Sequence, residues 1–300
     1  RSRLAIGFSR HRHRVVGLGR QGAGRADLPP IGRPGPRQSP RLSPRRRRYP
    51  PGPSRALASS VRRRLQSDAH FTYHRKNQGT FDPTWAIRNG VAHIEALRRS
   101  DDDVEIIFEV HTRLTPARAI EFCNAIEAYR PFFVEDPIRS ENPAAFATLR
   151  AHTNVALGTG EQLHTKWAYR ELIEGELIDY LRVDICHTGG ITEGKKIAAM
   201  GEIHYQELAC HYTGSPVSTA AMLHLNLSIP NCAVQEFAPA ADWMAEVTPH
   251  DWQLEDGYLF ASDSPGLGID INVDAARHHP PNLPDEPSHW RRADGSVNDW

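Results

Sequence analysis

The sequence predicts an α/β fold in which parallel strands and helices alternate around a barrel. Six short apolar runs recur about once every 25 residues, and each ends in an acidic residue or a histidine. Segments with helical spacing separate these runs, and such alternation implies parallel strands joined by right-handed crossovers. Because all strands of a βα barrel open their carboxyl ends onto one face, the six polar residues should share one pocket.

The six expected strands are short and apolar, as strands buried on both faces should be. They span residues 104–110, 132–135, 156–161, 180–184, 207–211 and 233–236, and they end at Glu109, Glu135, Glu161, Asp184, His211 and Glu236. Helices are expected between them at 116–128, 143–151, 166–174, 190–201 and 215–227. The alternative is an open doubly wound sheet, but nothing in the chain resembles the glycine-rich phosphate loop of that fold.

Residues 1–65 differ in composition from the rest of the chain. The 36 basic and 36 acidic residues cancel overall, but the first 65 residues hold 18 Arg, no Lys and one acid, Asp27. Pro and Gly crowd this segment, and its apolar residues show no period, so we predict that it is disordered. The expected organisation is therefore a disordered segment at 1–65, a partial barrel at 66–272 and a C-terminal extension at 273–300.

Three interpretations of the Arg-rich segment remain open. It could bind nucleic acid through phosphates, although it has few aromatic residues and no recognition module accompanies it. It could be a transit-type leader, although no amphipathic helix is convincing. We favour a third, in which a GC-rich coding region is translated out of frame.

A complete barrel of this kind needs about 200 to 250 residues and eight strands. With six strands found, we expect an N-terminally truncated or frameshifted barrel.

Three carboxylates at successive strand ends indicate a metal site. Glu109, Glu135 and Glu161 are evenly spaced, and a hard divalent cation such as Mg²⁺ prefers oxygen ligands with room left for water or a substrate carboxylate. A single strand-end carboxylate would more often be solvated or cap the following helix. Three carboxylates with the same spacing along the chain favour a metal site over solvated or capping side chains.

Two histidines at strand ends are candidate acid and base groups. His211 and Asp184 end neighbouring strands, and a carboxylate bonded to one imidazole nitrogen fixes the tautomer and raises the basicity of the other. His111 follows Glu109 by two residues, beside the proposed metal, where it could protonate a leaving group. Most of the other histidines are expected to be surface or core residues.

Several motifs, in the correct order, resemble the enolase superfamily and within it the acid-sugar dehydratases, meaning galactonate dehydratase and its mannonate dehydratase relatives. They are FFVEDP (132–137), GTGEQ (158–162), DICHTGGITE (184–193) and DSPGLGID (263–270). The end of the chain, ADGSVNDW (293–300), resembles the mannonate branch. The resemblance covers roughly 79–300 and implies a modified barrel with a separate capping domain.

The resemblance also implies roles for individual residues. Glu135 and Glu161 match the second and third Mg²⁺ ligands, and Glu109 stands at the first, where family members usually have Asp. The longer side chain could weaken binding, because Mg²⁺ demands near-ideal octahedral geometry. His111 matches the acid that helps the β-hydroxyl depart, and His211 matches the base that faces the α-carbon.

Two further positions match the family pattern. Asp184 matches the partner of His211 and resembles the galactonate type, in conflict with the mannonate-like end of the chain. Glu236 matches a group that is placed near the developing enediolate. The implied reaction is Mg²⁺-dependent loss of water from a sugar acid to give a 2-keto-3-deoxy acid, through an enediolate that the metal stabilises. Arg113, Gln162 and His187 suit recognition of substrate hydroxyls, and each is equally plausible as scaffold.

The sequence leaves two classes of function open. The chain is either a dehydratase or a catalytically impaired barrel that keeps the fold and metal binding. Its four cysteines are scattered with no CxxC pair, which argues against a zinc site and suits a reducing cytoplasm. No apolar run approaches the roughly 20 residues that cross a membrane. We expect a sugar-acid substrate, no nucleic-acid or membrane partner, a cytoplasmic location and a homo-oligomer.

Overall fold

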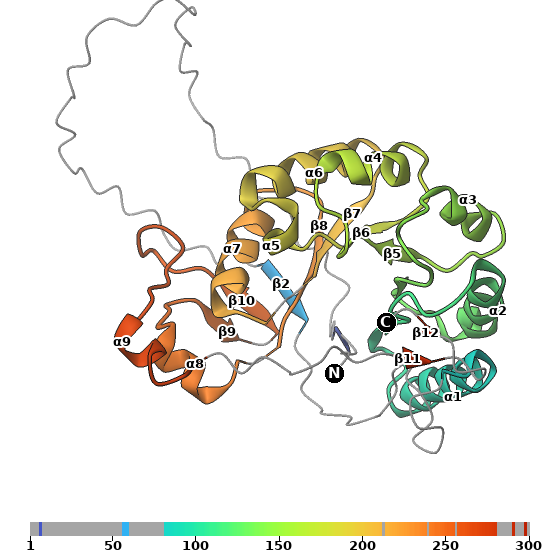
Figure 1. Cartoon of the computed structure of the whole chain (residues 1–300), viewed down its shortest axis with the longest axis horizontal. Coiled ribbons are helices and arrows are strands. Elements are labelled where there is room, and N and C mark those ends of the chain that lie inside the picture. The colour runs from blue at the N-terminus through green and yellow to red at the C-terminus, as the bar shows by residue number, and fades with distance from the viewer. Residues whose placement is uncertain are drawn as a thin grey trace, which may run out of the picture.

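Figure 1 shows the computed structural model of the chain. It describes residues 81–211, 214–238, 240–255 and 257–280, together with the backbone of four short strands, β1 (Ile6–Gly7), β2 (Ala56–Ser59), β11 (Trp290–Arg291) and β12 (Val297–Asn298). The central strands are β3 (Glu105–Glu109), β4 (Phe133–Glu135), β5 (Leu157–Thr159), β6 (Tyr180–Leu181), β7 (Glu207–Cys210) and β8 (Cys232–Glu236). Near the C-terminus lie β9 (Gln253–Glu255) and β10 (Tyr258–Phe260).

The six central strands confirm the barrel-type topology. They are parallel and stand in chain order, β3-β4-β5-β6-β7-β8. A doubly wound sheet would reverse its strand order at a switch point, so that alternative is wrong. Five of the six strands are shorter than the sequence predicts, and β8 is one residue longer. Glu161, Asp184 and His211 lie beyond the last residues of β5, β6 and β7. Asp184 and His211 still form an isolated parallel bridge.

Helices surround the central strands, and most of them line the outer side of the arc in Figure 1, whereas the last two lie near β9 and β10. They are α1 (Pro83–Ser100), α2 (Pro116–Ile126), α3 (Ala144–Arg150), α4 (Lys166–Glu174), α5 (Ile185–Thr188), α6 (Ile191–Ile203), α7 (Pro216–Leu227), α8 (Asp242–Val247) and α9 (Val273–Ala276), with a 3₁₀ turn at Glu127–Tyr129. The five predicted helices are present as α2, α3, α4, α6 and α7. The sequence analysis did not predict α1, which Asp82 caps by accepting hydrogen bonds from the N–H groups of Thr84 and Trp85.

Alternation along the strands sorts the side chains into two faces. Successive residues of a strand point to opposite faces. Phe108, Val134, Leu181, Leu208 and Cys210 point outward into the core beneath the helices. The intervening residues face the barrel interior, where Ile107, Phe133, Ala209 and Val234 form an apolar layer that Tyr180 joins.

The ionisable side chains lie one layer above this apolar floor. Glu109, Glu135, Arg182, His211 and Glu236 each follow an interior apolar residue by two positions. The period of two therefore directs all five side chains to the same side of the sheet, at the carboxyl ends of the strands.

Two short strands flank the central arc. β1 pairs antiparallel with β3, and β2 pairs parallel with β8, so each edge strand of the predicted six-strand arc has a neighbour. β2 also pairs with β10, which forms a hairpin with β9. Apart from β1 and β2, the predicted disorder of residues 1–65 lies outside the described residues. The barrel limits at 66 and 272, and the extension at 273–300, stay predictions. Within the described parts of the chain, no helix combines the length and apolarity that a membrane span requires.

Candidate active site at the carboxyl ends of the strands

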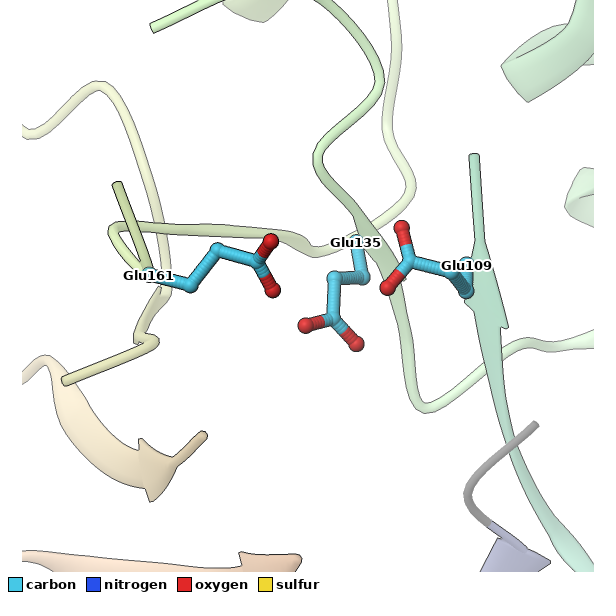
Figure 2. A group of neighbouring side chains, drawn as sticks. All are labelled: Glu109, Glu135 and Glu161. Atoms are coloured by element: carbon cyan, nitrogen blue, oxygen red, sulfur yellow. The ribbon is translucent and has the colours of Figure 1, made fainter. Parts of the chain in front are cut away.

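Three carboxyl groups converge at one end of the barrel. Glu109 and Glu135 are partners in the β3–β4 register, and Glu161 lies two residues beyond β5. Figure 2 shows the three side chains extending toward one another from neighbouring segments. One oxygen of each lies within 4.8 Å of the others, which makes them the one cluster of potential metal ligands among the residues that the structure describes.

The electrostatics of this cluster favour a cation. Burial is the largest cause that raises the pKa of Glu109 well above its usual value, and the charges of Glu135, Asp136 and Glu161 add to it. Burial likewise raises the pKa of Glu135 to about 7 and that of Asp136 to about 7. The pKa of Glu161 is also raised, first by burial. Several like charges therefore share a poorly solvated space.

The three glutamates fit an octahedral hard cation. Ligand oxygens on opposite sides of Mg²⁺ are about 4 Å apart. The cluster oxygens all lie within 4.8 Å of one another, so at most a small inward movement would complete the contacts. Asp136 adds negative charge beside them, and its Oδ2 is buried without a hydrogen-bond partner among the described residues. The donor set consists of carboxylate oxygens, the ligands that such ions prefer.

His211 lies between two carboxylates. Its Nδ1 is 2.8 Å from Asp184 Oδ2, and its Nε2 is 3.1 Å from Glu161 Oε2. Burial alone would lower the pKa of His211, but the hydrogen bond with Asp184 and the charge of Glu161 raise it overall. Burial alone would raise the pKa of Asp184, but its hydrogen bonds with His211 and the Cys186 N–H lower it. The structure thus brings His211 and Asp184 together as predicted, and adds a contact with Glu161.

His111 lies beside the carboxylate cluster. Its Nδ1 is 3.9 Å from Glu109 Oε1 and 3.9 Å from Glu161 Oε1. The backbone turns sharply here, since His111 and Thr112 have φ values of 55° and 62°, in the left-handed region that few non-glycine residues adopt. The His111 N–H donates to Glu109 Oε1, so this strained turn also fixes the first carboxylate.

The three predicted substrate-contact residues lie near Glu109 or Glu161, either along the chain or in space. Gln162 accepts a hydrogen bond from Ser140 through Oε1, and its buried Nε2 has no partner among the described residues. His187 is exposed, and its Nδ1 lies 3.0 Å from the Glu161 carbonyl oxygen. Arg113 is partly buried, and burial lowers its pKa to about 10.

The sequence analysis missed two charged residues of the site. Arg182 is fully buried and donates hydrogen bonds to Glu135 and to Glu236 Oε2, the latter at 2.6 Å. Asp136 is also buried and accepts a hydrogen bond from the hydroxyl of Thr159. The signal for Arg182 was present, because a charged residue between Leu181 and Val183 in a buried strand requires a partner.

Comparison with known proteins places this geometry in a family. A family model described as "Enolase C-terminal domain-like" matches residues 56–276. The chain belongs to the enolase superfamily. In that superfamily, a D-mannonate dehydratase from Caulobacter vibrioides is 41% identical over 200 residues, which are 66% of this chain and 49% of that protein. A D-galactonate dehydratase family member from Pantoea ananatis is 40% identical over 179 residues, 59% of this chain and 43% of that protein.

Solved structures also resemble this chain in fold and sequence. An enolase from Pantoea ananatis with bound D-gluconate and Mg matches with a TM-score of 0.69 and 36% identity, over 73% of this chain and 54% of that chain. A protein structure from Salmonella matches with a TM-score of 0.64 and 37% identity, over 69% of this chain and 52% of that chain. This enolase-superfamily chain spans about half the length of these relatives.

Proposed function

We propose that the protein is an Mg²⁺-dependent acid-sugar dehydratase, a hydro-lyase that converts an aldonate into a 2-keto-3-deoxy acid. The observation that carries the proposal is the convergence of three carboxylates with the His211–Asp184 pair and His111 at one end of the barrel. The similarity to mannonate and galactonate dehydratases, and to an enolase with bound D-gluconate and Mg, supports the same reaction class.

Glu109, Glu135 and Glu161 are the groups that would hold Mg²⁺. When bound, the cation supplies positive charge against the substrate carboxylate, which becomes more negative as the α-proton leaves. Arg182 donates to both Glu135 and Glu236, and we assign Glu236 a place beside that developing charge.

His211 acts as the base. Asp184 holds the Nδ1 side of its ring, so Nε2 is the nitrogen that takes the α-proton. As the α C–H bond breaks, its electron pair forms the carbon–carbon double bond of an enol, and the β C–O bond breaks. His111 donates a proton to the departing hydroxyl, which leaves as water. The enol then becomes the 2-keto-3-deoxy acid by proton transfer to carbon.

Gln162, Arg113 and His187 are proposed to contact the sugar hydroxyls. The donor on Gln162 Nε2 supports this assignment, since a buried N–H without a protein partner is costly unless a ligand accepts from it. The homo-oligomer, the cytoplasmic location and the absence of nucleic-acid and membrane partners stay predictions.

The second candidate is a barrel that binds metal without turnover. The observation that favours it is Glu109 itself, whose carboxylate stands where the family usually has Asp and already accepts a hydrogen bond from its own turn. A chain with this change could keep its ligands and lose the geometry that turnover requires.

Calorimetric titration with Mg²⁺, run beside a screen of sugar acids for 2-keto-3-deoxy products, tests both candidates. Glu161→Gln should weaken Mg²⁺ binding by about tenfold or more. Glu105→Gln is the matched control, because Glu105 is exposed at the opposite end of the strand that carries Glu109. Binding with product supports the dehydratase, and binding without product supports the impaired barrel. Wild-type binding that Glu161→Gln does not weaken contradicts the metal site.

A further inference from the structure

Arg182 is a buried charge at the centre of the site. It is 1% exposed and heads the fully buried side chains by size. It follows β6, and its neighbours Leu181 and Val183 point outward into the apolar core while its own side chain points into the barrel. A charge in this position is tolerated only when its partners are close and well oriented.

The guanidinium group of Arg182 joins three other strands. Nε donates to Glu135 on β4, and Nη2 donates to Glu236 Oε2 on β8 at 2.6 Å. Nη1 donates to the carbonyl oxygens of Ala209 at 2.8 Å and Cys210 at 3.2 Å, both on β7. The planar fork of arginine makes such a set of bonds possible, and lysine could not reproduce it.

The contact with Glu135 has a consequence for the metal position. Arg182 donates to Oε1 of Glu135, and the same carboxylate contributes an oxygen to the cluster with Glu109 and Glu161. The guanidinium and a bound metal ion would therefore share this carboxylate.

We propose that Arg182 is a positioning residue that orients Glu135 and Glu236 and carries part of the charge balance of the site when the metal is absent. The inference rests on the metal site of the proposed function. It implies that the folded barrel tolerates its cluster of acidic groups without Mg²⁺ because a permanent cation is already present. It also implies that this cation repels the incoming metal to some extent.

Arg182→Met keeps most of the length of the side chain and removes its charge and donors. Glu135 and Glu236 are then buried without their partner, which destabilises the metal-free protein. A bound divalent cation offsets part of that loss and stabilises the folded state by mass action. The melting temperature of Arg182→Met should therefore rise more on Mg²⁺ addition than that of wild type, by about 2 °C or more.

The test is thermal unfolding of the whole chain in EDTA and in saturating Mg²⁺. Arg150→Met is the matched control, because Arg150 also joins a carboxylate, Asp179, to two backbone carbonyls, but away from the carboxylate cluster. Its loss of stability should be equal in the two buffers. Arg182→Lys keeps the charge, and its Mg²⁺ response should return toward that of wild type.

Each outcome separates the inference from the proposed function. If Mg²⁺ stabilises wild type and raises Arg182→Met by no more than wild type, the role of Arg182 is overturned and the metal site stands. If Mg²⁺ leaves wild type unchanged, the metal site fails and the inference fails with it. Should Arg182→Met not fold, Arg182→Met/Glu236→Gln removes one unpaired carboxylate and should recover a folded, Mg²⁺-responsive protein. Failure of that variant too would show a packing role and overturn the inference.

Discussion

Replacing Gly158 by alanine should destabilise the apolar floor of the site. An added Cβ would lie 2.8 Å from Phe133 Cδ2, 2.9 Å from Phe133 Cε2 and 3.4 Å from Tyr180 Cβ. Ordinary contacts begin near 3.4 Å, so the Phe133 ring would have to retreat by at least about 0.6 Å. The loss of stability is therefore steric, and the residue that must move is Phe133, two positions before Glu135.

The Phe133 ring has little room to move. It is fully buried, stacks on Tyr180 with ring centroids 4.7 Å apart and packs with Ile107, Ala209 and Val234. Overpacking of this kind costs about 1–3 kcal/mol. In a domain of this size each kcal/mol lowers the melting temperature by about 2–4 °C.

A double-mutant cycle in urea measures the effect. Phe133→Leu alone should destabilise the protein, because it removes buried ring atoms. In Gly158→Ala/Phe133→Leu the smaller side chain makes room for the new methyl group, so the combined loss should fall short of the sum by about 0.5 kcal/mol or more. Gly190→Ala is the comparison, since nothing lies within 4 Å of its Cβ and its φ of 87° alone penalises alanine. Additive losses for Gly158 and Phe133, or a neutral Gly158→Ala, would refute the packing argument.

Two further substitutions and one labelling experiment test other parts of the structure. Asp184→Asn keeps a hydrogen-bond acceptor for the N-terminus of α5 but removes the charge beside His211. We expect kcat to fall about 100-fold while the fold stays intact. An unchanged kcat would argue against His211 as the base. Tyr169→Phe removes a buried hydroxyl that donates to a backbone carbonyl at 2.7 Å, and urea unfolding should show a loss of about 1 kcal/mol. Iodoacetamide should label Cys186, which is exposed, and spare Cys123, which is buried. Burial raises the pKa of the Cys123 thiol to about 12. If mass spectrometry of the native protein found both cysteines labelled, the burial of Cys123 would be contradicted.

The positions of the strands and of their polar ends could be predicted because one pattern encodes both. A parallel strand of a barrel is apolar on both faces until its last residues, where it reaches solvent and the ligand. Glu109, Glu135 and Glu236 are the last residues of their strands, as expected. Asp184 and His211 lie beyond theirs, but the parallel bridge between them keeps the register that the pattern indicates.

Contacts that cross several strands could not be predicted in this way. Arg182 reaches from the end of β6 to β4 and β8, and nothing in the local spacing names Glu135 and Glu236 as its partners. The contact between His211 and Glu161 is equally non-local, because it depends on the conformation of the segment after β5, which brings Glu161 close to the end of β7. Helix α1 was missed because it precedes the first expected strand, outside the repeating pattern.

The contact between Glu161 and His211 would link the proposed metal site to the proposed base. Glu161 is a proposed ligand, and it also lies 3.1 Å from Nε2 of His211, the nitrogen proposed to accept the α-proton. A cation held by Glu161 would compete with the imidazole for the charge of that carboxylate, whereas Asp184 would still hold Nδ1. Under the proposed function, one carboxylate would therefore serve both the metal site and the base.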